Sequence, residues 1–365
     1  MKKIFLAFTI ILVATGLLFA GGASETAEPK ADAPLKIGMI YVSPPGDMGY
    51  SYMHAQGTRA AEAYFGDKVE FIELESVPEN EQAASAMENL IDEGCEMVFA
   101  TSYNYQDYML EVAKKHPDIY FEHCSGYLSN DNMSNYFGRM YQMRYLSGMI
   151  AGAMAKNGKI GYIGAYNTPE VIRGANAFTL GAQRMNPDVE VRVVWTNTWF
   201  DPQLERQAAM SLLDEGVDVI AQHQDTTEPA KAAIEKGKYA IGYNADFRSI
   251  IKDDRVLVSP MWNWQNYVIP TIESHMNGTW HSQSYWGGLE DEMIKLSEIS
   301  PLVPENVVAE VEKVLHEMHD KTFDVFWGEI WDNEGNKIQD KGEKMSDADM
   351  LSMKWFVKGI TGSTK

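Results

Sequence analysis

Three things are scarce in this chain of 365 residues: cysteine, basic side chains and long apolar runs. It has two cysteines, and 31 Lys and Arg residues against 52 Asp and Glu residues. Apart from one run at the N-terminus, no apolar stretch reaches the roughly 20 residues of a membrane-spanning helix. Each scarcity excludes a class of protein.

The acidic balance argues against polyanionic partners. The formal net charge is −21 at pH 7, and it becomes −23 once Lys2 and Lys3 are removed with the leader described below. A surface of this sign repels nucleic-acid phosphates and anionic lipid head groups. We therefore expect no nucleic-acid partner.

The two cysteines are not placed to pair. Cys95 precedes the apolar run Met97–Ala100, and Cys124 ends the next strand-like run. If these runs are parallel neighbours, the cysteines lie about six residues, roughly 20 Å, apart, which is beyond the reach of a disulfide. We expect two buried free thiols and no redox chemistry.

The motifs of the main enzyme chemistries are also missing. We find no nucleophile elbow, no glycine-rich phosphate loop and no set of metal ligands at the required spacing. His316 and His319 are three residues apart rather than four and are expected on a solvated helix face. We therefore expect no catalysis, no cofactor and no metal. An enzyme is the alternative from another class, and turnover of a bound ligand would support it.

The N-terminus is typical of a secretion signal. Two lysines precede the apolar run Ile4–Phe19, and small residues follow up to Ala23, near which we expect cleavage. A lipid anchor needs a cysteine at the cleavage point, and the first cysteine is Cys95, so there is no lipobox. Residues 24–35 lack apolar periodicity and are expected to form a flexible stalk. We expect a periplasmic or other extracytoplasmic protein, tethered by its leader if that is not cut.

From residue 36, short apolar runs alternate with amphipathic helical stretches, which predicts parallel sheets covered on both faces. A connecting helix is expected near residues 140–157, between two cycles of this alternation. The expected strands are Ile37–Val42, Val69–Leu74, Met97–Ala100 and Ile119–His123, then Ile160–Gly164, Val189–Thr196, Val217–Ala221, Ala240–Tyr243 and Val256–Ser259. The pattern predicts an α/β fold with two doubly wound lobes in series.

The lobe boundaries follow from the same pattern. The expected ranges are 36–153 plus about 261–281 for the N-terminal lobe, 154–259 plus about 282–300 for the C-terminal lobe, and 301–365 for C-terminal helices and a hairpin packed on the lobes.

Within that last region, Val303–His319 is expected to be helical. A hairpin is expected over Phe323–Ile338, turning at the Asp-rich string 332–335, which lacks the ligands of a calcium loop. Ser346 with Asp349 forms a capping box, from which a last helix is expected to run to about Gly359.

Candidate site residues follow the strands, because ligands of open parallel sheets bind beyond the carboxyl ends of the strands. In the first half they are Asp47, Tyr50, His54, Ser102, Tyr103, Asn104 and Tyr127. Tyr50 and His54 share a helix face and are expected to point into a cleft. Asp47 and Asn104 can instead serve as helix caps.

The second half offers a similar set. Glu170 follows the first strand of this half, although it can instead pair with Arg173. Trp199 is the strongest candidate for stacking on a flat ligand, because an indole before a helix start is hard to explain as core. The further candidates are Asn197 and Phe200 beside that indole, Asp225 in the string 222–226, Asn244 and Asp246 in the string 242–246, and Trp262.

These strings, together with Tyr-Trp-Gly-Gly-Leu at 285–289 and Met-Lys-Trp-Phe-Val at 353–357, resemble the basic membrane protein family of ABC-transporter substrate-binding proteins. The first loop, with its Asp-x-Gly-aromatic sequence followed by His54, is most similar to the purine-binding branch, which includes the purine nucleoside receptors. The resemblance covers nearly the whole chain from about residue 36. It implies the type I periplasmic binding fold, in which two α/β lobes are joined by three crossings.

The resemblance also implies roles for individual residues. Tyr50 and Trp199 fall at the positions of the two aromatics that sandwich a purine, and Asn244 falls where nucleoside receptors carry a carboxylate that binds ribose. Asn244 in place of aspartate, and Trp262 in place of a lysine, depart from the nucleoside pattern. We therefore expect a free purine base such as adenine, bound between lobes that close by hinge motion.

The partners implied are a small purine ligand and a membrane permease, and we expect a monomer. Purine nucleosides and riboflavin are alternative ligands, and a sensing domain of a signalling system is an alternative role, since the same fold serves both.

Overall fold

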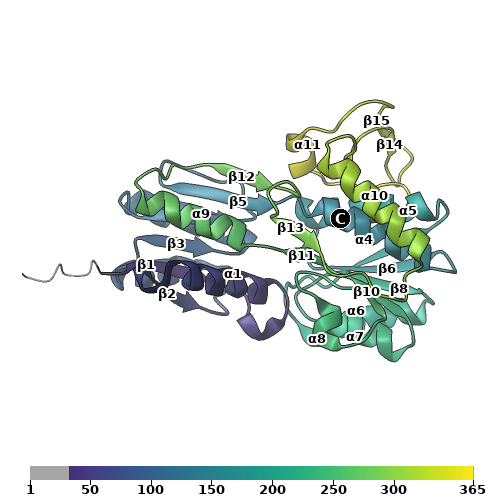
Figure 1. Ribbon diagram of the computed structural model, residues 1–365, viewed down its shortest axis with the longest axis horizontal. Helices are drawn as coiled ribbons and strands as arrows, with labels where there is room; N and C mark the ends of the chain where they lie inside the picture. Colours follow the sequence, from purple (N-terminus) through teal and green to yellow (C-terminus); the bar gives the residue numbers. More distant parts are fainter. Residues whose placement is uncertain (1–32, 365) are drawn as a thin grey trace, which may run out of the picture. The chain divides into compact units, whose positions relative to one another are not determined.

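The structure is a computed structural model, and it describes residues 33–364. The expected secretion signal and all but the end of the expected stalk lie outside the described residues. Two six-stranded sheets form the centres of two α/β lobes (Figure 1). No helix within residues 33–364 is long and apolar enough to cross a bilayer.

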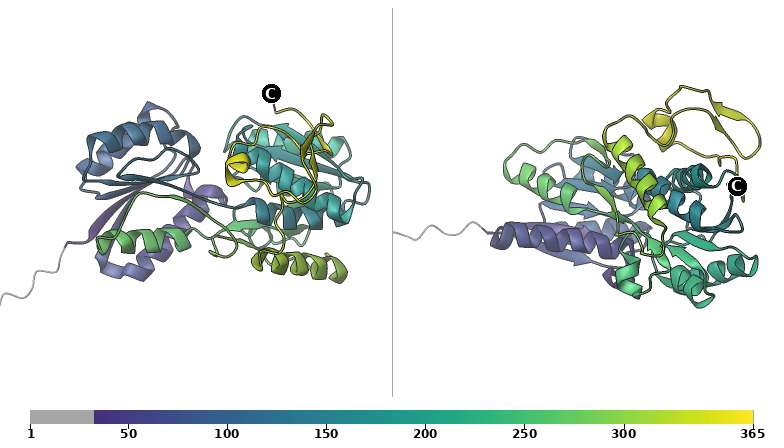
Figure 2. Two further views of the ribbon diagram at one scale, coloured as in Figure 1. Left: turned by 90° about the horizontal axis from the view of Figure 1, so that it is seen from above. Right: turned by 45° about the vertical axis from the view of Figure 1, so that its right-hand side comes forward.

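The first lobe is built on a sheet of parallel strands in the order β12-β5-β4-β3-β1-β2. Alternate residues of its strands point to opposite faces, so Ile37 and Met39 join one core cluster while Ile40 and Val98 join another. Helices α1 and α9 cover the first face, and α2 and α3 cover the second (Figure 2). The elements are β1 (Leu35–Ile40), α1 (Tyr50–Phe65), β2 (Val69–Leu74), α2 (Glu81–Asp92), β3 (Met97–Ala100), α3 (Gln106–Lys115), β4 (Tyr120–Cys124), β5 (Met133–Gly138), α9 (Gln265–Met276) and β12 (Ser284–Gly287).

The second lobe repeats this plan with the strand order β10-β9-β8-β6-β7-β16. Helices α4 and α5 pack together on one side, and α6 packs with α7. The elements are α4 (Tyr141–Met154), β6 (Lys159–Gly164), α5 (Pro169–Met185), β7 (Glu190–Trp195), α6 (Pro202–Asp214), β8 (Val219–His223), α7 (Glu228–Glu235), β9 (Tyr239–Ile241), α8 (Phe247–Ile251), β10 (Val256–Val258) and β16 (Ile360–Thr361).

Three crossings join the lobes. The first runs from β5 into α4, and the other two form a small antiparallel ladder of β11 (Pro260–Trp262) with β13 (Ile294–Leu296). Helix α10 (Glu305–His319) then packs on α4, and it is followed by the hairpin of β14 (Ile330–Trp331) and β15 (Lys337–Gln339) and by the short helix α11 (Asp347–Leu351). The two-lobed type I periplasmic binding fold expected from the sequence is confirmed.

Four parts of the expected pattern differ from the structure. The strand β5 was not predicted, and Ser284–Gly287, expected in the C-terminal lobe, pairs instead with β5 in the first sheet. These strands contain polar residues that are satisfied only in the sheet, as when Asn135 donates from Nδ2 to Ser284 Oγ at 2.9 Å. The crossing expected near residue 282 therefore comes after Gly287.

The last helix is also shorter than expected. Ser346 caps it as predicted, by accepting a hydrogen bond from the backbone N–H of Asp349, but the helix ends at Leu351 rather than near Gly359. Beyond it, Asn176 of α5 donates to the carbonyl of Trp355 and accepts from the N–H of Val357. These side-chain bonds hold the backbone in an irregular path that leads to β16, which was not predicted.

Two smaller predictions are confirmed. Cys95 and Cys124 are both buried and free, on the neighbouring parallel strands β3 and β4 or just before them. The hairpin turns at Asp332, whose Oδ1 accepts hydrogen bonds from the N–H groups of Glu334 and Asn336. Its strands are shorter than the expected span from Phe323 to Ile338.

Glycines let α4 and α5 pack at backbone contact, and this packing fixes the start of α5, which carries Glu170. A Cβ atom added at Gly148 would lie 2.0 Å from the carbonyl oxygen of Phe178, and one at Gly181 would lie 2.0 Å from that of Tyr145. Neither backbone oxygen can move aside without separating the helices.

We therefore predict that Gly148→Ala destabilises the protein by about 1–3 kcal/mol or more, because overpacking outweighs the roughly 1 kcal/mol that alanine gains over glycine in a helix. The matched control is Gly174→Ala in α5, whose added Cβ would meet its neighbours at ordinary distances of 3.5 Å and beyond. Urea unfolding of both variants tests this. Equal stability of the two variants would contradict it.

Candidate functional site

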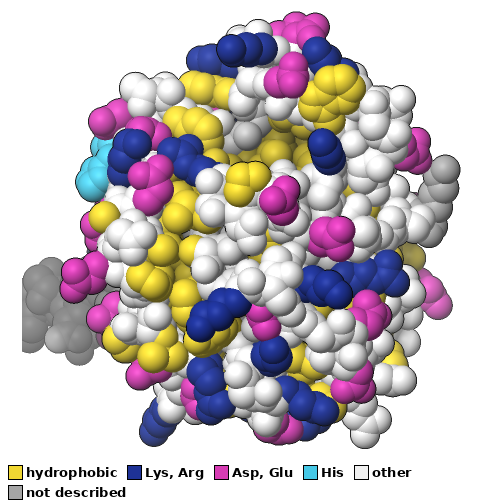
Figure 3. Space-filling model, turned by 90° about the vertical axis from the view of Figure 1, so that its right-hand side faces the viewer, with side chains coloured by type: hydrophobic (Ala, Val, Ile, Leu, Met, Phe, Trp, Pro, Cys, Tyr) yellow, Lys and Arg dark blue, Asp and Glu magenta, His cyan; other side chains and the backbone are white. Residues whose placement is uncertain are grey.

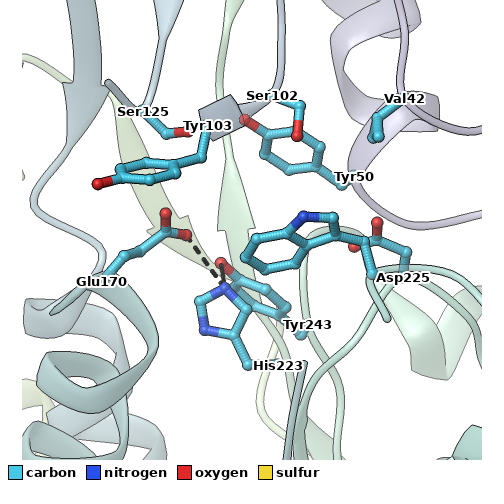
Figure 4. Close-up of a pocket in the computed structure, with 10 residues that line it drawn as sticks. Val42, Tyr50, Ser102, Tyr103, Ser125, Glu170, His223, Asp225 and Tyr243 are labelled. Atoms are coloured by element: carbon cyan, nitrogen blue, oxygen red, sulfur yellow. Dashed lines mark hydrogen bonds and ion pairs between the residues drawn. The ribbon is translucent and has the colours of Figure 1, made fainter. Parts of the chain in front are cut away.

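A cavity lies where the carboxyl ends of the strands of the two sheets face each other. Its lining residues follow β1, β3 and β4 in the first lobe and follow or end β6, β7, β8 and β9 in the second. Only about 20 Å³ of this space is open to a water-sized molecule, so the lining side chains nearly close the cavity. The lining consists of Val42, Tyr50, Ser102, Tyr103, Ser125, Glu170, Trp199, His223, Asp225 and Tyr243 (Figure 4).

The loop after β1 is organised by Asp47. Its carboxylate accepts hydrogen bonds from the N–H groups of Gly49, Ser51 and Tyr52, at 2.7 to 3.2 Å, and from the hydroxyl of Ser43. Burial raises the pKa of Asp47, while these bonds act in the opposite direction. Asp47 is thus a helix cap that does not line the cavity, and it sets Tyr50 at the start of α1.

The ring of Tyr50 lines the cavity and packs against a stack of buried rings. Its hydroxyl donates to the carbonyl of Thr101 at 2.7 Å, and its ring meets His54 edge-on at 4.6 Å. His54 stacks on Trp264 at 4.1 Å, and Trp264 stacks on Trp262 at 4.4 Å. Burial lowers the pKa of His54 well below its usual range, so the ring is neutral. His54 and Trp262 were predicted to contact ligand, but both lie behind the lining.

In the second lobe, the cavity is lined by a carboxylate and two rings that are joined by hydrogen bonds. His223 Nε2 lies 3.1 Å from Glu170 Oε1 and 3.3 Å from the hydroxyl of Tyr243, and Figure 4 shows Glu170 and His223 side by side below Tyr103. Burial lowers the pKa of His223. The guanidinium of Arg144 covers the Tyr243 ring at 3.5 Å from its centroid. The sequence predicted Glu170 as a candidate, whereas His223 and Tyr243 lie in the strings 222–226 and 242–246 but were not chosen from them.

Asp225 lies opposite Gly49, at a close approach of the two lobes. A Cβ atom at Gly49 would lie 2.1 Å from the carbonyl oxygen of Asp225, so only glycine fits there. Burial and the neighbouring Asp47, Glu205 and Glu170 raise the pKa of Asp225 well above its usual range. Its carboxyl group therefore holds a proton to unusually high pH.

Asn244 lies behind Asp225 rather than in the cavity. It is fully buried, adopts a left-handed backbone with φ of 68°, and donates from Nδ2 to Asp225 Oδ1 at 3.4 Å. Its Oδ1 accepts a hydrogen bond from Trp262 Nε1 at 2.9 Å. One end of the Asn244 amide is therefore engaged by Asp225 and the other by Trp262, and the expected contact with a ligand stays a prediction.

Of the fifteen candidate residues, six line the cavity: Tyr50, Ser102, Tyr103, Glu170, Trp199 and Asp225. Besides Asp47, His54, Asn244 and Trp262, the candidates outside the lining are Asn104, Tyr127, Asn197, Phe200 and Asp246.

Each of these last five has another position or role. Asn104 donates to Glu79, and Asp246 caps α8 by accepting from the N–H of Ser249. Tyr127 is 69% exposed and lines an adjoining groove, Asn197 is exposed, and Phe200 is half-buried beside the cavity. These five residues lie in the same loops as the lining residues, but their side chains do not face the cavity.

The cavity is rich in hydrogen-bond acceptors. Glu170 and Asp225 line it, Asp47 and Glu205 lie behind it, and the described lining contains no Lys or Arg. Glu205 is buried and its pKa is raised to about 7, mainly by burial. The arrangement favours ligands that present N–H or O–H groups and disfavours phosphorylated ones. Within residues 33–364, no three His, Cys, Asp or Glu side chains come together in a way that could hold a metal ion.

Comparison with known proteins agrees with this architecture. The family described as ABC transporter substrate-binding protein PnrA-like matches residues 35–329. A purine-binding protein of Brucella abortus is 38% identical over 96% of this chain and 98% of its own length. A putative ABC transporter glucose-binding protein of Haloferax volcanii is 35% identical over 93% of this chain and 85% of its own.

Solved structures show the same fold at low sequence identity. A solute-binding protein of an ABC transporter system from Aeropyrum pernix superposes with a TM-score of 0.69 at 20% identity, covering 80% of this chain and 93% of that one. A transcriptional activator of the comK gene from Bacillus halodurans superposes with a TM-score of 0.68 at 22% identity, covering 79% of this chain and 99% of that one.

The position of Asn244 predicts a pH-dependent loss of stability in Asn244→Asp. Aspartate tolerates the left-handed backbone, but it places a second carboxyl group against Asp225. Both groups then have raised pKa values, so the stability present at low pH is lost as pH rises and one of them must ionise. We expect a melting temperature near that of the wild type at pH 4, close to the unfolded pKa of aspartate, and clearly below it at pH 8.

Asn244→Ala is the control, because it removes the same hydrogen bonds without adding an acid. Its melting temperature is expected to fall by a similar amount at both pH values. A pH-independent difference between Asn244→Asp and the wild type would contradict this account of the Asp225 environment.

Proposed function

Because the chain belongs to the PnrA-like family of ABC transporter substrate-binding proteins, we propose that it captures a free purine base, adenine-like, in the cavity between its lobes. Proteins of this family bind a small molecule outside the cytoplasm and work with a membrane permease; they are not enzymes. The observation that carries the purine proposal is a small cavity with aromatic rings from both lobes and two carboxyl groups with unfilled oxygens.

Aromatic rings supply the affinity for a flat ligand. Tyr50 and Tyr103 reach the cavity from the first lobe, and Trp199 reaches it from the second. Stacking on an aromatic ring is worth about 1–3 kcal/mol per base. Two such faces with several buried hydrogen bonds account for the roughly −8 kcal/mol of a micromolar complex.

Polar groups select among flat ligands. Glu170 uses Oε1 on His223, and Asp225 uses Oδ1 on Asn244; the second oxygen of each has no hydrogen-bond partner among residues 33–364. Adenine offers an exocyclic amine and a ring N–H to such acceptors. A protonated Asp225 can in turn donate to a purine ring nitrogen. Adenine thus matches both roles.

Several features favour the base over larger ligands. Position 244 carries an asparagine rather than a carboxylate that could bind a ribose. The Asn244 side chain is hydrogen-bonded to Asp225 and Trp262. The relative with 38% identity is described as purine-binding, which agrees with this choice.

We further propose that the N-terminal segment directs export, that the lobes close on the ligand by hinge motion, and that the monomer presents the closed form to its permease. On the face seen in Figure 3, Lys and Arg side chains are interspersed with Asp and Glu rather than gathered in one basic patch. This face therefore gives no support to a nucleic-acid partner.

The test is isothermal titration of the ligand-stripped protein with adenine, guanine, hypoxanthine, adenosine, inosine, riboflavin and glucose. We predict saturable binding of adenine at micromolar or lower concentration and at least about tenfold weaker binding of adenosine. Glucose is included because of the relative named for it. Preference for a nucleoside or riboflavin would contradict the choice of ligand, and binding of glucose alone would contradict purine binding altogether.

A further inference from the structure

The carboxylate of Glu79 lies outside the cavity lining and accepts a hydrogen bond from the indole of Trp199, which is part of the lining. Glu79 lies in the loop between β2 and α2 and accepts four hydrogen bonds. Three come from its own lobe: from the Ser102 hydroxyl at 2.5 Å, the Asn104 N–H at 3.0 Å and Asn104 Nδ2 at 3.2 Å. The fourth comes from the other lobe, where Trp199 Nε1 donates to Glu79 Oε2 at 3.2 Å.

The three hydrogen bonds within the first lobe hold the Glu79 carboxylate in the position from which it accepts the fourth. A carboxylate has about four lone-pair sites, so these four donors fill it. Ser102 and Asn104 follow β3 and move with the first lobe, as Glu79 does. The oxygen that meets the indole is therefore held in place before the lobes come together, and little ordering is required when the bond forms.

The bond from Trp199 fixes the plane of its indole. Trp199 lies in the loop between β7 and α6, where its carbonyl accepts a hydrogen bond from the N–H of Asp225 at 3.3 Å. Its ring meets Tyr166 edge-on, with the centroids 5.1 Å apart. With the N–H directed at Glu79, rotation of the ring is restricted from two sides.

We propose that Glu79 is a positioning residue that orients the indole of Trp199 for stacking and links the two lobes whether or not a ligand is bound. The proposal rests on the proposed function in one respect, since it assigns Trp199 to ligand stacking. Glu79 touches no ligand itself and acts through the indole N–H.

The Glu79 carboxylate also leaves the Ser102 hydroxyl able only to accept hydrogen bonds from the cavity. Because the Ser102 hydroxyl donates its proton to Glu79, it offers the cavity only lone pairs. Ser102 then adds to the acceptors Glu170 and Asp225 that favour a ligand with N–H groups. Glu79 thus acts on both the stacking and the hydrogen-bonding sides of the site.

The test is a double-mutant cycle with adenine as the titrated ligand. Glu79→Ala removes the acceptor, and Trp199→Phe keeps a flat ring but removes the N–H. We expect Glu79→Ala to weaken adenine binding about tenfold or more, mainly by raising the dissociation rate, because the lost bond involves a charged group. In the Trp199→Phe background, the same substitution is expected to weaken binding less than about threefold.

Equal effects of Glu79→Ala in the two backgrounds would overturn the proposal, because Glu79 would then act only by anchoring the Ser102–Asn104 segment. The matched control is Glu75→Ala, an exposed residue in the same loop, which is expected to leave the affinity unchanged. Glu79→Gln is a milder variant if the alanine variant fails to fold, with an expected loss in the same direction.

A second measurement needs no ligand and separates this proposal from the proposed function. In protein labelled with ¹⁵N at its nine tryptophans, Trp199→Phe identifies the Trp199 indole resonance. We expect Glu79→Ala to shift that resonance and to speed its exchange with solvent, and Glu75→Ala to change neither. An unmoved resonance would overturn the role of Glu79. Absence of adenine binding by the wild type, with the resonance shifted, would reject the ligand and keep the positioning contact.

Discussion

Burial of carboxyl groups at the carboxyl ends of two parallel sheets is the constraint on which the site depends. A buried carboxyl group is costly unless donors satisfy it. Asp47 is satisfied by backbone N–H groups, Glu205 by Thr226, and Glu79 by the donors of two lobes. Among residues 33–364, Glu170 and Asp225 each retain one carboxyl oxygen without a hydrogen-bond partner. The satisfied carboxyl groups lie outside the lining, and the two with a free oxygen face the cavity.

Aromatic packing supports the same arrangement. The stack of Trp262, Trp264 and His54 lies under Tyr50, and it begins at the β11 crossing between the lobes. The Tyr50 ring, which lines the cavity in the first lobe, therefore rests on side chains of the crossing between the lobes. Trp262 also donates to Asn244 and so reaches Asp225 in the second lobe. The same side chains thus pack at the crossing between the lobes and support the lining of the cavity.

Much of the fold was predictable, and the errors have a common cause. Nine strands followed from apolar runs, because strands buried on both faces are apolar throughout. The strand β5 contains Ser134 and Asn135, and it was missed because its polar groups are satisfied by partners far along the chain. The two-residue strand β16 lies at a sheet edge beside β7 and has too little pattern of its own to be recognised.

The sequence alone determined the two α/β cycles, the acidic charge and the loops in which the site lies, because these depend on local periodicity and composition. Only the tertiary structure decided which side chains of those loops face the cavity. Tyr50 and His54 share a helix face, yet one lines the cavity and the other lies in the core. Glu79 was not a candidate, because its partner Trp199 is 120 residues away. Such contacts arise when distant loops meet, which no local pattern records.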